Sequence, residues 1–238
     1  SILFLFYKEP PQPLYEQPVV EKTGDDSDFD PEDDSPSGLV KKAKSLMSEH
    51  RELIAILFAI FFLFCGYNAI ETYLSLYSTY ILNITPGEAS TIFALLAGAF
   101  LVFTIPAGFI GEKLGRLKSM IIGLAVITAC LCVIMVYPVK EIVQVLMIVN
   151  GFSWALVMIN SYPYVVSLAP SNRLGKYTGY YYFFSFFASI VSPLLFGAIV
   201  NRTKDYKILF VYSAVMFTLA LCILVPLWIV NTRQKKAD

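Results

Sequence analysis

The sequence predicts an all-α polytopic membrane protein with six transmembrane helices. Hydrophobic residues make up 57% of the 238 residues, and the mean hydropathy is +0.64. Only 15% of the residues are charged, against about 25% in a soluble domain. Long uncharged apolar runs recur along the chain, whereas no long stretch alternates apolar and polar residues as barrel strands do. This composition excludes a soluble enzyme and a fully disordered chain.

Residues 1–8 form a short apolar segment that ends in Lys8. So few residues cannot span a bilayer, and a signal peptide needs a longer apolar core with basic residues before it. We therefore expect residues 1–8 to be the end of a preceding transmembrane helix, with an N-terminal part of the protein upstream of this chain.

Residues 9–38 carry ten acidic residues and six of the 13 prolines, with a single lysine. So polar a segment has too few apolar residues to offset the entropy cost of ordering, which predicts a disordered acidic linker. A calcium site is the alternative, but the acids lack the glycine and the terminal glutamate of an EF-hand loop.

Residues 39–52 predict an amphipathic helix that lies on the membrane surface. Apolar residues recur there at helical spacing, and basic residues occupy much of the remaining surface. A calmodulin-type target helix is the alternative. The apolar positions are Leu39, Val40, Ala43, Leu46 and Met47, and the basic ones are Lys41, Lys42, Lys44 and Arg51.

The six transmembrane helices are predicted within a domain of residues 53–230, followed by a tail of residues 231–238. Glu71 is the only charged residue in the predicted spans. An acid inside a membrane helix is costly unless it is paired, protonated or hydrated, so Glu71 is a functional candidate. The predicted spans are 53–81, 89–110, 119–138, 142–168, 177–200 and 208–230.

The distribution of basic residues predicts the orientation. If the 9–52 segment is cytoplasmic, 14 lysines and arginines lie on its side of the membrane and 4 on the other. We therefore expect a multi-pass protein of the plasma membrane with a cytoplasmic linker and a cytoplasmic C-terminus.

We expect no metal site and no cofactor, because His50 is the only histidine and the four cysteines all fall in apolar runs. No nucleophile–base pair is evident, so we expect no enzyme activity. The basic residues lie beside the predicted membrane, which excludes nucleic acid as a partner.

The segment from Gly108 to Lys118 resembles the signature G-x-x-x-D-[RK]-x-G-R-[RK] of the major facilitator superfamily. Glu112 stands in place of the usual Asp, and Leu117 occupies a position that is often basic. The resemblance implies that this chain is the C-terminal six-helix half of a 12-helix transporter. It also implies an inner-side conformational latch made of Gly108, Glu112, Lys113, Gly115 and Arg116.

Three further stretches look like the sucrose-type and glycoside–pentoside–hexuronide:cation symporter branches. They are residues 66–73, residues 151–154 together with 160–163, and residues 174–181. The resemblance implies cation-coupled transport of a sugar or glycoside. It also implies a cavity lined by the spans 53–81, 89–110, 142–168 and 177–200. The other two spans are apolar nearly throughout, which predicts that they face lipid.

Polar residues on the first span share one face at helical spacing. Asn68, Glu71, Ser75 and Ser78 follow each other at intervals of three or four, with Tyr67 beside them. Three roles remain open for Glu71: lining a cavity, coupling to a proton or cation, or a structural role near the outer interface. Coupling requires a carboxyl that is neutral in one state and charged in another.

Two other spans contribute candidates. Asn150 and Trp154 share a face, and an amide beside an indole suits a sugar; plain packing is the alternative role for Trp154. Asn160 lies further along the same span, beside a proline at position 163 that permits a bend. The polar ridge of the fifth span, which serves either cavity lining or close helix packing, consists of Tyr181, Ser185, Ser189 and Ser192.

Three functions follow as hypotheses. The first is proton- or cation-coupled transport of a sugar or glycoside, and the second is efflux of an amphipathic drug-like compound by the same fold. The third is a membrane sensor or scaffold that transports nothing. The expected partners are a small-molecule substrate, the lipid bilayer and an N-terminal six-helix half.

Overall fold

The computed structural model describes residues 36–170 and 173–237. The segment 1–8 and nearly all of the predicted linker 9–38 lie outside these residues, so both interpretations stay predictions. The described chain forms six helices, each with an apolar stretch long enough to cross a membrane, which confirms the predicted fold class. They are α1 (Pro36–Ile81), α2 (Pro86–Leu114), α3 (Arg116–Val136), α4 (Lys140–Ser167), α5 (Leu174–Thr203) and α6 (Ile208–Ala237).

Helix α1 is 46 residues long and runs without a break through the segment predicted as a separate surface helix. Its membrane-crossing part is Arg51–Ile81. That residues 39–52 lie on a membrane surface stays a prediction. Chain contacts divide the protein into residues 1–45 and 46–238, and the packing below is that of the second unit.

Local sequence explains where α2 begins. Thr85 caps the helix, Pro86 occupies its first turn, and the backbone N–H of Glu88 donates to Thr85 Oγ1 at 3.4 Å. In return the backbone N–H of Thr85 donates to Glu88 Oε2 at 3.0 Å, which completes a capping box. Lys140 Nζ lies 2.6 Å from Glu88 Oε1, so the same carboxylate also ties α2 to the start of α4.

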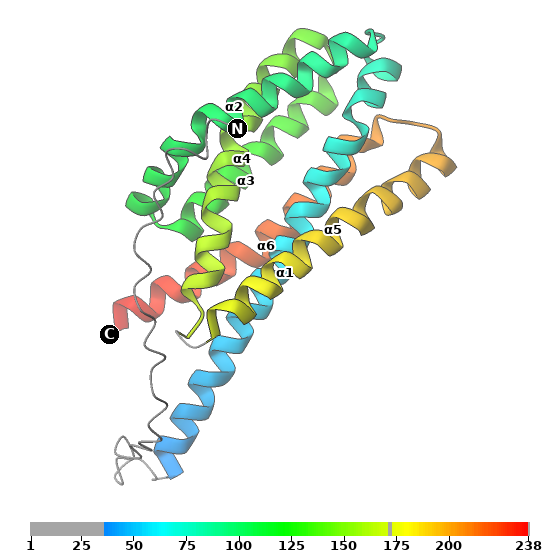
Figure 1. The fold of residues 1–238 in the computed structure, drawn as a ribbon. Coiled ribbons are helices and arrows are strands. Elements are labelled where there is room, and N and C mark those ends of the chain that lie inside the picture. Colours follow the sequence, from blue (N-terminus) through cyan, green and yellow to red (C-terminus); the bar gives the residue numbers. More distant parts are fainter. Residues whose placement is uncertain (1–35, 171–172, 238) are drawn as a thin grey trace, which may run out of the picture. The chain divides into compact units, whose positions relative to one another are not determined.

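Helices α2, α3 and α4 pack closely because small residues stand at their crossings (Figure 1). A Cβ atom at Gly151 of α4 would overlap the carbonyl oxygen of Leu96 in α2. A Cβ atom at Gly123 of α3 would lie 2.6 Å from the carbonyl oxygen of Ser153 in α4. Glycine is therefore required at both crossings, as in other membrane helix pairs.

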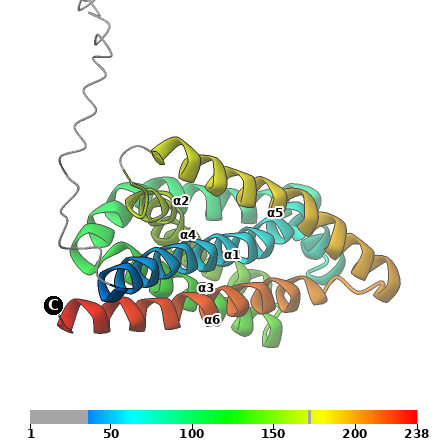
Figure 2. The ribbon, with the colours of Figure 1, turned by 90° about the horizontal axis from the view of Figure 1, so that it is seen from below.

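Helix α1 lies between α5 and α6 (Figures 1 and 2). The Ser192 hydroxyl of α5 donates to the Cys65 carbonyl of α1, which pins these two helices together. On the opposite side, the Phe217 ring of α6 lies against Gly66 of α1, where no larger residue would fit.

The six helices differ in how much of them is buried. In the most apolar segment of α2 only 17% of the residues are buried, and in that of α5 28%, against 44–56% in the other four helices. Large apolar side chains stand exposed on both, including Leu101 and Ile105 of α2 and Phe186 and Leu194 of α5. Helices α2 and α5 therefore present the most apolar surface with no partner inside the described chain.

Candidate functional site

A groove of about 480 Å³ lies between α1, α4 and α5. This volume falls within the ~300–1,000 Å³ range of small-molecule sites. Helix α1 contributes Phe64, Tyr67, Asn68 and Glu71; α4 contributes Met158 and Tyr162; α5 contributes Tyr181, Tyr182, Ser185, Phe186 and Ser189. We call this the α1–α4–α5 groove.

The structure brings six of the predicted site residues into this groove. They come from two of the four spans expected to line a cavity, and they are Tyr67, Asn68, Glu71, Tyr181, Ser185 and Ser189. The other four, which are Ser75, Asn150, Trp154 and Asn160, do not line it. Helix α2, also expected at the cavity, contributes no residue to the groove.

Glu71 is the only charged side chain among the residues that line the groove. Its side chain is exposed, and its carboxylate forms no hydrogen bond with the residues that the structure describes. The polar stripe predicted for this helix is divided, since Ser75 is exposed outside the groove. Ser78 is fully buried, and its hydroxyl has no partner among the described residues.

The polar neighbours of Glu71 donate hydrogen bonds to their own helices. Asn68 Nδ2 donates to the Phe64 carbonyl at 2.7 Å. Ser185 Oγ donates to the Tyr182 carbonyl at 3.1 Å, and Ser189 Oγ donates to the Phe186 carbonyl at 2.8 Å. The oxygens of all three side chains keep free lone pairs that can accept.

Aromatic rings of α4 and α5 form a cluster that lines the same groove as Glu71. The Tyr181 ring meets the rings of Tyr162 and Tyr182 edge-on, at centroid distances of 5.3 and 5.5 Å. Tyr182 in turn stacks on Phe186 at 5.7 Å. The hydroxyls of Tyr181 and Ser161 lie 3.0 Å apart and hydrogen bond, which fixes the ring at the centre of the cluster.

The contribution of Tyr162 and Met158 to the groove was not predicted. Both belong to α4, four residues apart, and therefore share a face of the helix. That spacing was the available signal. The more conspicuous Asn150–Trp154 pair, with the same spacing earlier in α4, drew the prediction to a different level of the helix.

Trp154 lies behind the groove rather than in it. Its indole is only 4% exposed and stacks on the Tyr67 ring, with centroids 4.1 Å apart and planes 2° from parallel. Asn150 is also buried and lines a separate cavity of about 20 Å³ with Tyr67 and Trp154. Its Oδ1 atom has no hydrogen-bond partner among the described residues.

Asn160 joins two helices instead of lining the groove. It is 3% exposed, and its Nδ2 atom donates to the Ala107 carbonyl of α2 at 3.3 Å and to the Leu156 carbonyl at 2.8 Å. Its side chain fills the space above Gly111, where a Cβ atom would overlap it.

The residues predicted as a latch lie in the last two turns of α2, at the α2–α3 turn and at the start of α3. Gly115 adopts a φ of 92°, in the region that favours glycine, and so separates the two helices. Arg116 Nη1 donates to the Pro163 carbonyl at 2.9 Å, near the negative C-terminal end of α4. Gly108 lies against Ile159 of α4, whereas Glu112 and Lys113 are exposed.

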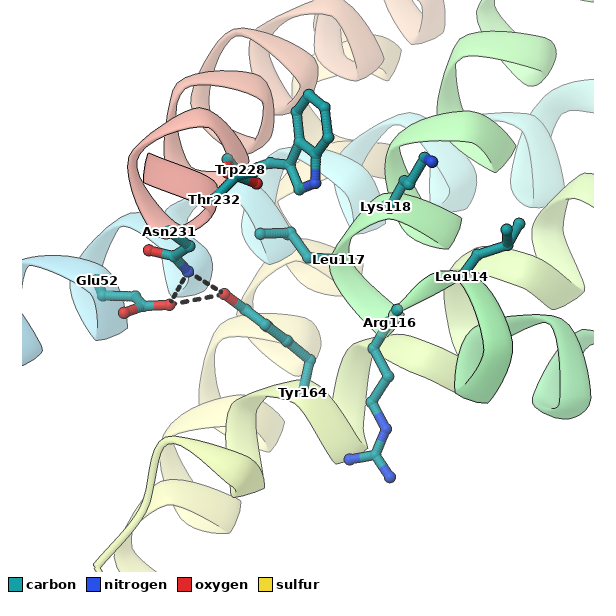
Figure 3. Close-up of a pocket in the computed structure, with 10 residues that line it drawn as sticks. Glu52, Leu114, Arg116, Leu117, Lys118, Tyr164, Trp228, Asn231 and Thr232 are labelled. Carbon is teal, nitrogen blue, oxygen red and sulfur yellow. Dashed lines mark hydrogen bonds between the residues drawn. The ribbon is translucent and has the colours of Figure 1, made fainter. Parts of the chain in front are cut away.

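A hydrogen-bonded cluster beside this turn was not predicted (Figure 3). Tyr164 Oη and Asn231 Nδ2 both donate to Glu52 Oε1 at 2.7 Å, and Asn231 Nδ2 also lies 3.2 Å from Tyr164 Oη. The three residues come from α4, α6 and α1, and they line a pocket of about 490 Å³ with the α2–α3 turn. Arg116 points away from this Glu52 cluster.

Comparison with known proteins identifies a family. A sequence model described as Major Facilitator Superfamily matches residues 56–238. No curated protein matches the chain.

Solved transporter structures share the fold at low sequence identity. A POT family transporter in complex with 5-aminolevulinic acid superposes with a TM-score of 0.67 at 18% identity, covering 74% of this chain and 37% of the transporter. A mutant of the peptide transporter POT in complex with sulfate gives 0.63 at 19%, covering 73% and 37%. A bacterial homologue of the human drug peptide transporters gives 0.61 at 14%, covering 75% and 40%. The chain thus spans about two fifths of these transporters.

Proposed function

This chain belongs to the major facilitator superfamily, and from that we propose that it is the C-terminal half of a secondary active transporter that works by alternating access. The observation that carries the proposal is the α1–α4–α5 groove, which a single carboxylate lines together with aromatic rings. In this proposal the groove is the chain's share of the substrate path.

The partner of this half is a second six-helix half. Helices α2 and α5 are the least buried, and their exposed apolar side chains include Leu101, Ile105, Phe186 and Leu194. A second bundle docked on these two helices would cover those side chains and would close the groove beside α5 into a central cavity. The coverage of about two fifths of the solved transporters fits a half of the complete protein.

The proposed orientation places the Glu52 cluster and the α2–α3 turn on the cytoplasmic side of the plasma membrane. The end of the bundle that holds the pocket in Figure 3 also carries the basic residues Lys113, Arg116 and Lys118, as expected of a cytoplasmic end. The C-terminus of α6 follows Asn231 at the same end and is therefore cytoplasmic too.

Glu71 is the proposed coupling group. A single carboxylate in an apolar groove can exchange a proton for a cation when access changes from one side of the membrane to the other. Its exposed position in the groove, without an internal partner in the described chain, leaves it free to do so.

The substrate class is a small organic molecule. The expectation of a sugar came from the resemblance to sugar symporters and from Asn150 and Trp154. Both residues are buried, and Trp154 stacks on Tyr67. The groove itself is walled by four tyrosines, two phenylalanines and a methionine. This lining favours the second hypothesis, an amphipathic compound, over a glycoside.

In the proposed mechanism the α2–α3 turn is the inner-side latch. Arg116 holds the end of α4, while the exposed Glu112 is available to the other half of the transporter. Glu112→Ala should shift the ratio of inward- to outward-facing states, measured by spin-label distances, more than it changes substrate affinity. A change in affinity alone would contradict the latch.

The proposal is tested by uptake into proteoliposomes that contain the complete transporter. Probes are sucrose, the dye rhodamine 6G and tryptamine, each with and without an imposed pH gradient. We expect gradient-dependent movement of at least one probe, abolished by Glu71→Gln and retained by Glu141→Gln, an exposed carboxylate outside the groove. If the gradient moves none of the probes, the transport proposal is wrong.

A further inference from the structure

We infer that the ligand of the α1–α4–α5 groove is an organic cation, an amine carried on an aromatic or other apolar body. The inference rests on the proposed function and narrows its substrate class. It follows from three properties of the groove: its charge, the balance of its hydrogen-bonding groups and its ring faces.

The groove carries one negative charge, and no positively charged residue lines it. Glu71 supplies the only carboxylate, and none of the lining residues is a lysine, an arginine or a histidine. A ligand carboxylate or phosphate would meet Glu71 with no cation nearby on this wall, whereas an ammonium group would be attracted to it.

The two serines and the asparagine that line the groove with Glu71 offer mostly acceptors. The hydroxyl protons of Ser185 and Ser189 are already donated to carbonyls of α5, and one amide proton of Asn68 is donated to Phe64. What remains on these side chains is chiefly oxygen lone pairs, to which the two oxygens of Glu71 add more. A ligand rich in N–H donors matches this arrangement.

The aromatic rings also suit a cation with an apolar body. Tyr162, Tyr181, Tyr182 and Phe186 form a continuous cluster whose members lie 5.3–6.0 Å from one another between ring centroids. Ring faces attract ammonium groups, and the same faces bury an apolar ligand body. The cluster and Glu71 line one groove, so one ligand can use both.

Two other ligand classes fit this wall less well. A sugar presents alternating donors and acceptors, but the two serine hydroxyls have no free proton to offer it, which leaves only the tyrosine hydroxyls and the second Asn68 amide proton as donors. An anionic compound would need a lysine or an arginine, which the groove residues do not include.

The test uses three probes that share an indole ring and differ in charge: tryptamine (cationic), tryptophol (neutral) and indole-3-propionate (anionic). Equilibrium binding to the complete purified transporter is measured at pH 7.5 by scintillation proximity or calorimetry. We expect tryptamine to bind about 10- to 100-fold more tightly than tryptophol, the ratio for a hydrogen bond to a charged group, and indole-3-propionate to bind most weakly.

The variants separate the charge from the shape of the groove. Glu71→Gln should remove the preference, so that tryptamine and tryptophol bind with about equal affinity. Glu71→Asp keeps the charge and should retain most of the preference. Glu141→Gln is the matched control and should leave the preference unchanged, because residue 141 is exposed outside the groove. Tryptophol binding by Glu71→Gln reports that the groove is still folded.

The outcomes distinguish the inference from the proposed function. Equal binding of tryptamine and tryptophol by the unaltered protein, or a preference for indole-3-propionate, overturns the cation inference. Gradient-driven uptake of sucrose in the same preparation would overturn it too, while leaving the transport proposal intact. Conversely, selective tryptamine binding without gradient-driven movement of any probe would support the inference and overturn the transport proposal.

Discussion

Replacing Tyr164 by Phe should destabilise the bundle, because it removes one donor from the Glu52 cluster. The Tyr164 hydroxyl donates to Glu52 Oε1 at 2.7 Å and also lies 3.2 Å from Asn231 Nδ2. The substitution keeps the ring and its packing and leaves the hydrogen bond from Asn231 to Glu52 in place.

The expected magnitude follows from the chemistry and exposure of this bond. A hydrogen bond to a charged group contributes about 1.5–3 kcal/mol. Glu52 and Tyr164 are both half-buried, so water can replace part of the lost interaction. We therefore expect a loss of about 1–2 kcal/mol in the free energy of unfolding, at the lower end of that range.

The assay is chemical or thermal unfolding of the detergent-solubilised transporter, in a double-mutant cycle with Glu52→Gln. The cycle isolates the pairwise term, which should be about 1 kcal/mol for groups in direct contact. Tyr80→Phe is the matched control, since Tyr80 is 62% exposed. If Tyr164→Phe unfolds like Tyr80→Phe, or if the two cluster variants are additive, the cluster does not hold the three helices together.

Three further predictions concern Gly151, Gly115 and Glu71. Gly151→Ala would force its new methyl group against the Leu96 carbonyl, so the free energy of unfolding should fall by about 1–3 kcal/mol in the same assay. Gly115→Ala has room for its methyl group but not the backbone freedom for a φ of 92°, so we expect a cost of about 1–3 kcal/mol, again measured by unfolding. Tryptamine affinity should fall as the pH is lowered from about 7 towards the ordinary carboxyl range near 4, because a protonated Glu71 cannot pair with a cation; calorimetry at each pH tests this, and Glu71→Gln should abolish the dependence.

Hydropathy and charge predicted the helices well because the membrane imposes the same length and polarity on every span. The span predicted at 119–138 corresponds to α3 (Arg116–Val136), and the span predicted at 142–168 corresponds to α4 (Lys140–Ser167). The start of α1 was harder to predict from the sequence, because a surface helix and a membrane helix have the same backbone conformation and can join without a break.

The groove was only partly predictable, since periodicity assigns a residue to a face but not to a depth. The spacing of Asn68 and Glu71 correctly grouped two residues that line the groove. The same reasoning grouped Asn150 with Trp154, but both are buried, and Trp154 stacks on Tyr67 of another helix. Nothing local to the sequence indicates that ring-on-ring contact.

The Glu52 cluster shows a second limit of reasoning from local pattern. Its members belong to three helices, and each looks ordinary within its own segment. Tyr164 follows a proline near the end of its span, and Asn231 stands just beyond the last predicted span. Only the spatial arrangement of the helix ends brings them together around one carboxylate (Figure 3).

The parallel contact of Tyr67 with Trp154 gives this protein a built-in optical reporter. The two rings belong to α1 and α4, so sliding or tilting one helix against the other separates them and changes the surroundings of the indole. The sequence has two tryptophans, and the second, Trp228, is 37% exposed near the end of α6. A Trp228→Phe background would leave the emission of Trp154 as the signal from this chain, and its wavelength and lifetime would follow the α1–α4 movement without any added label.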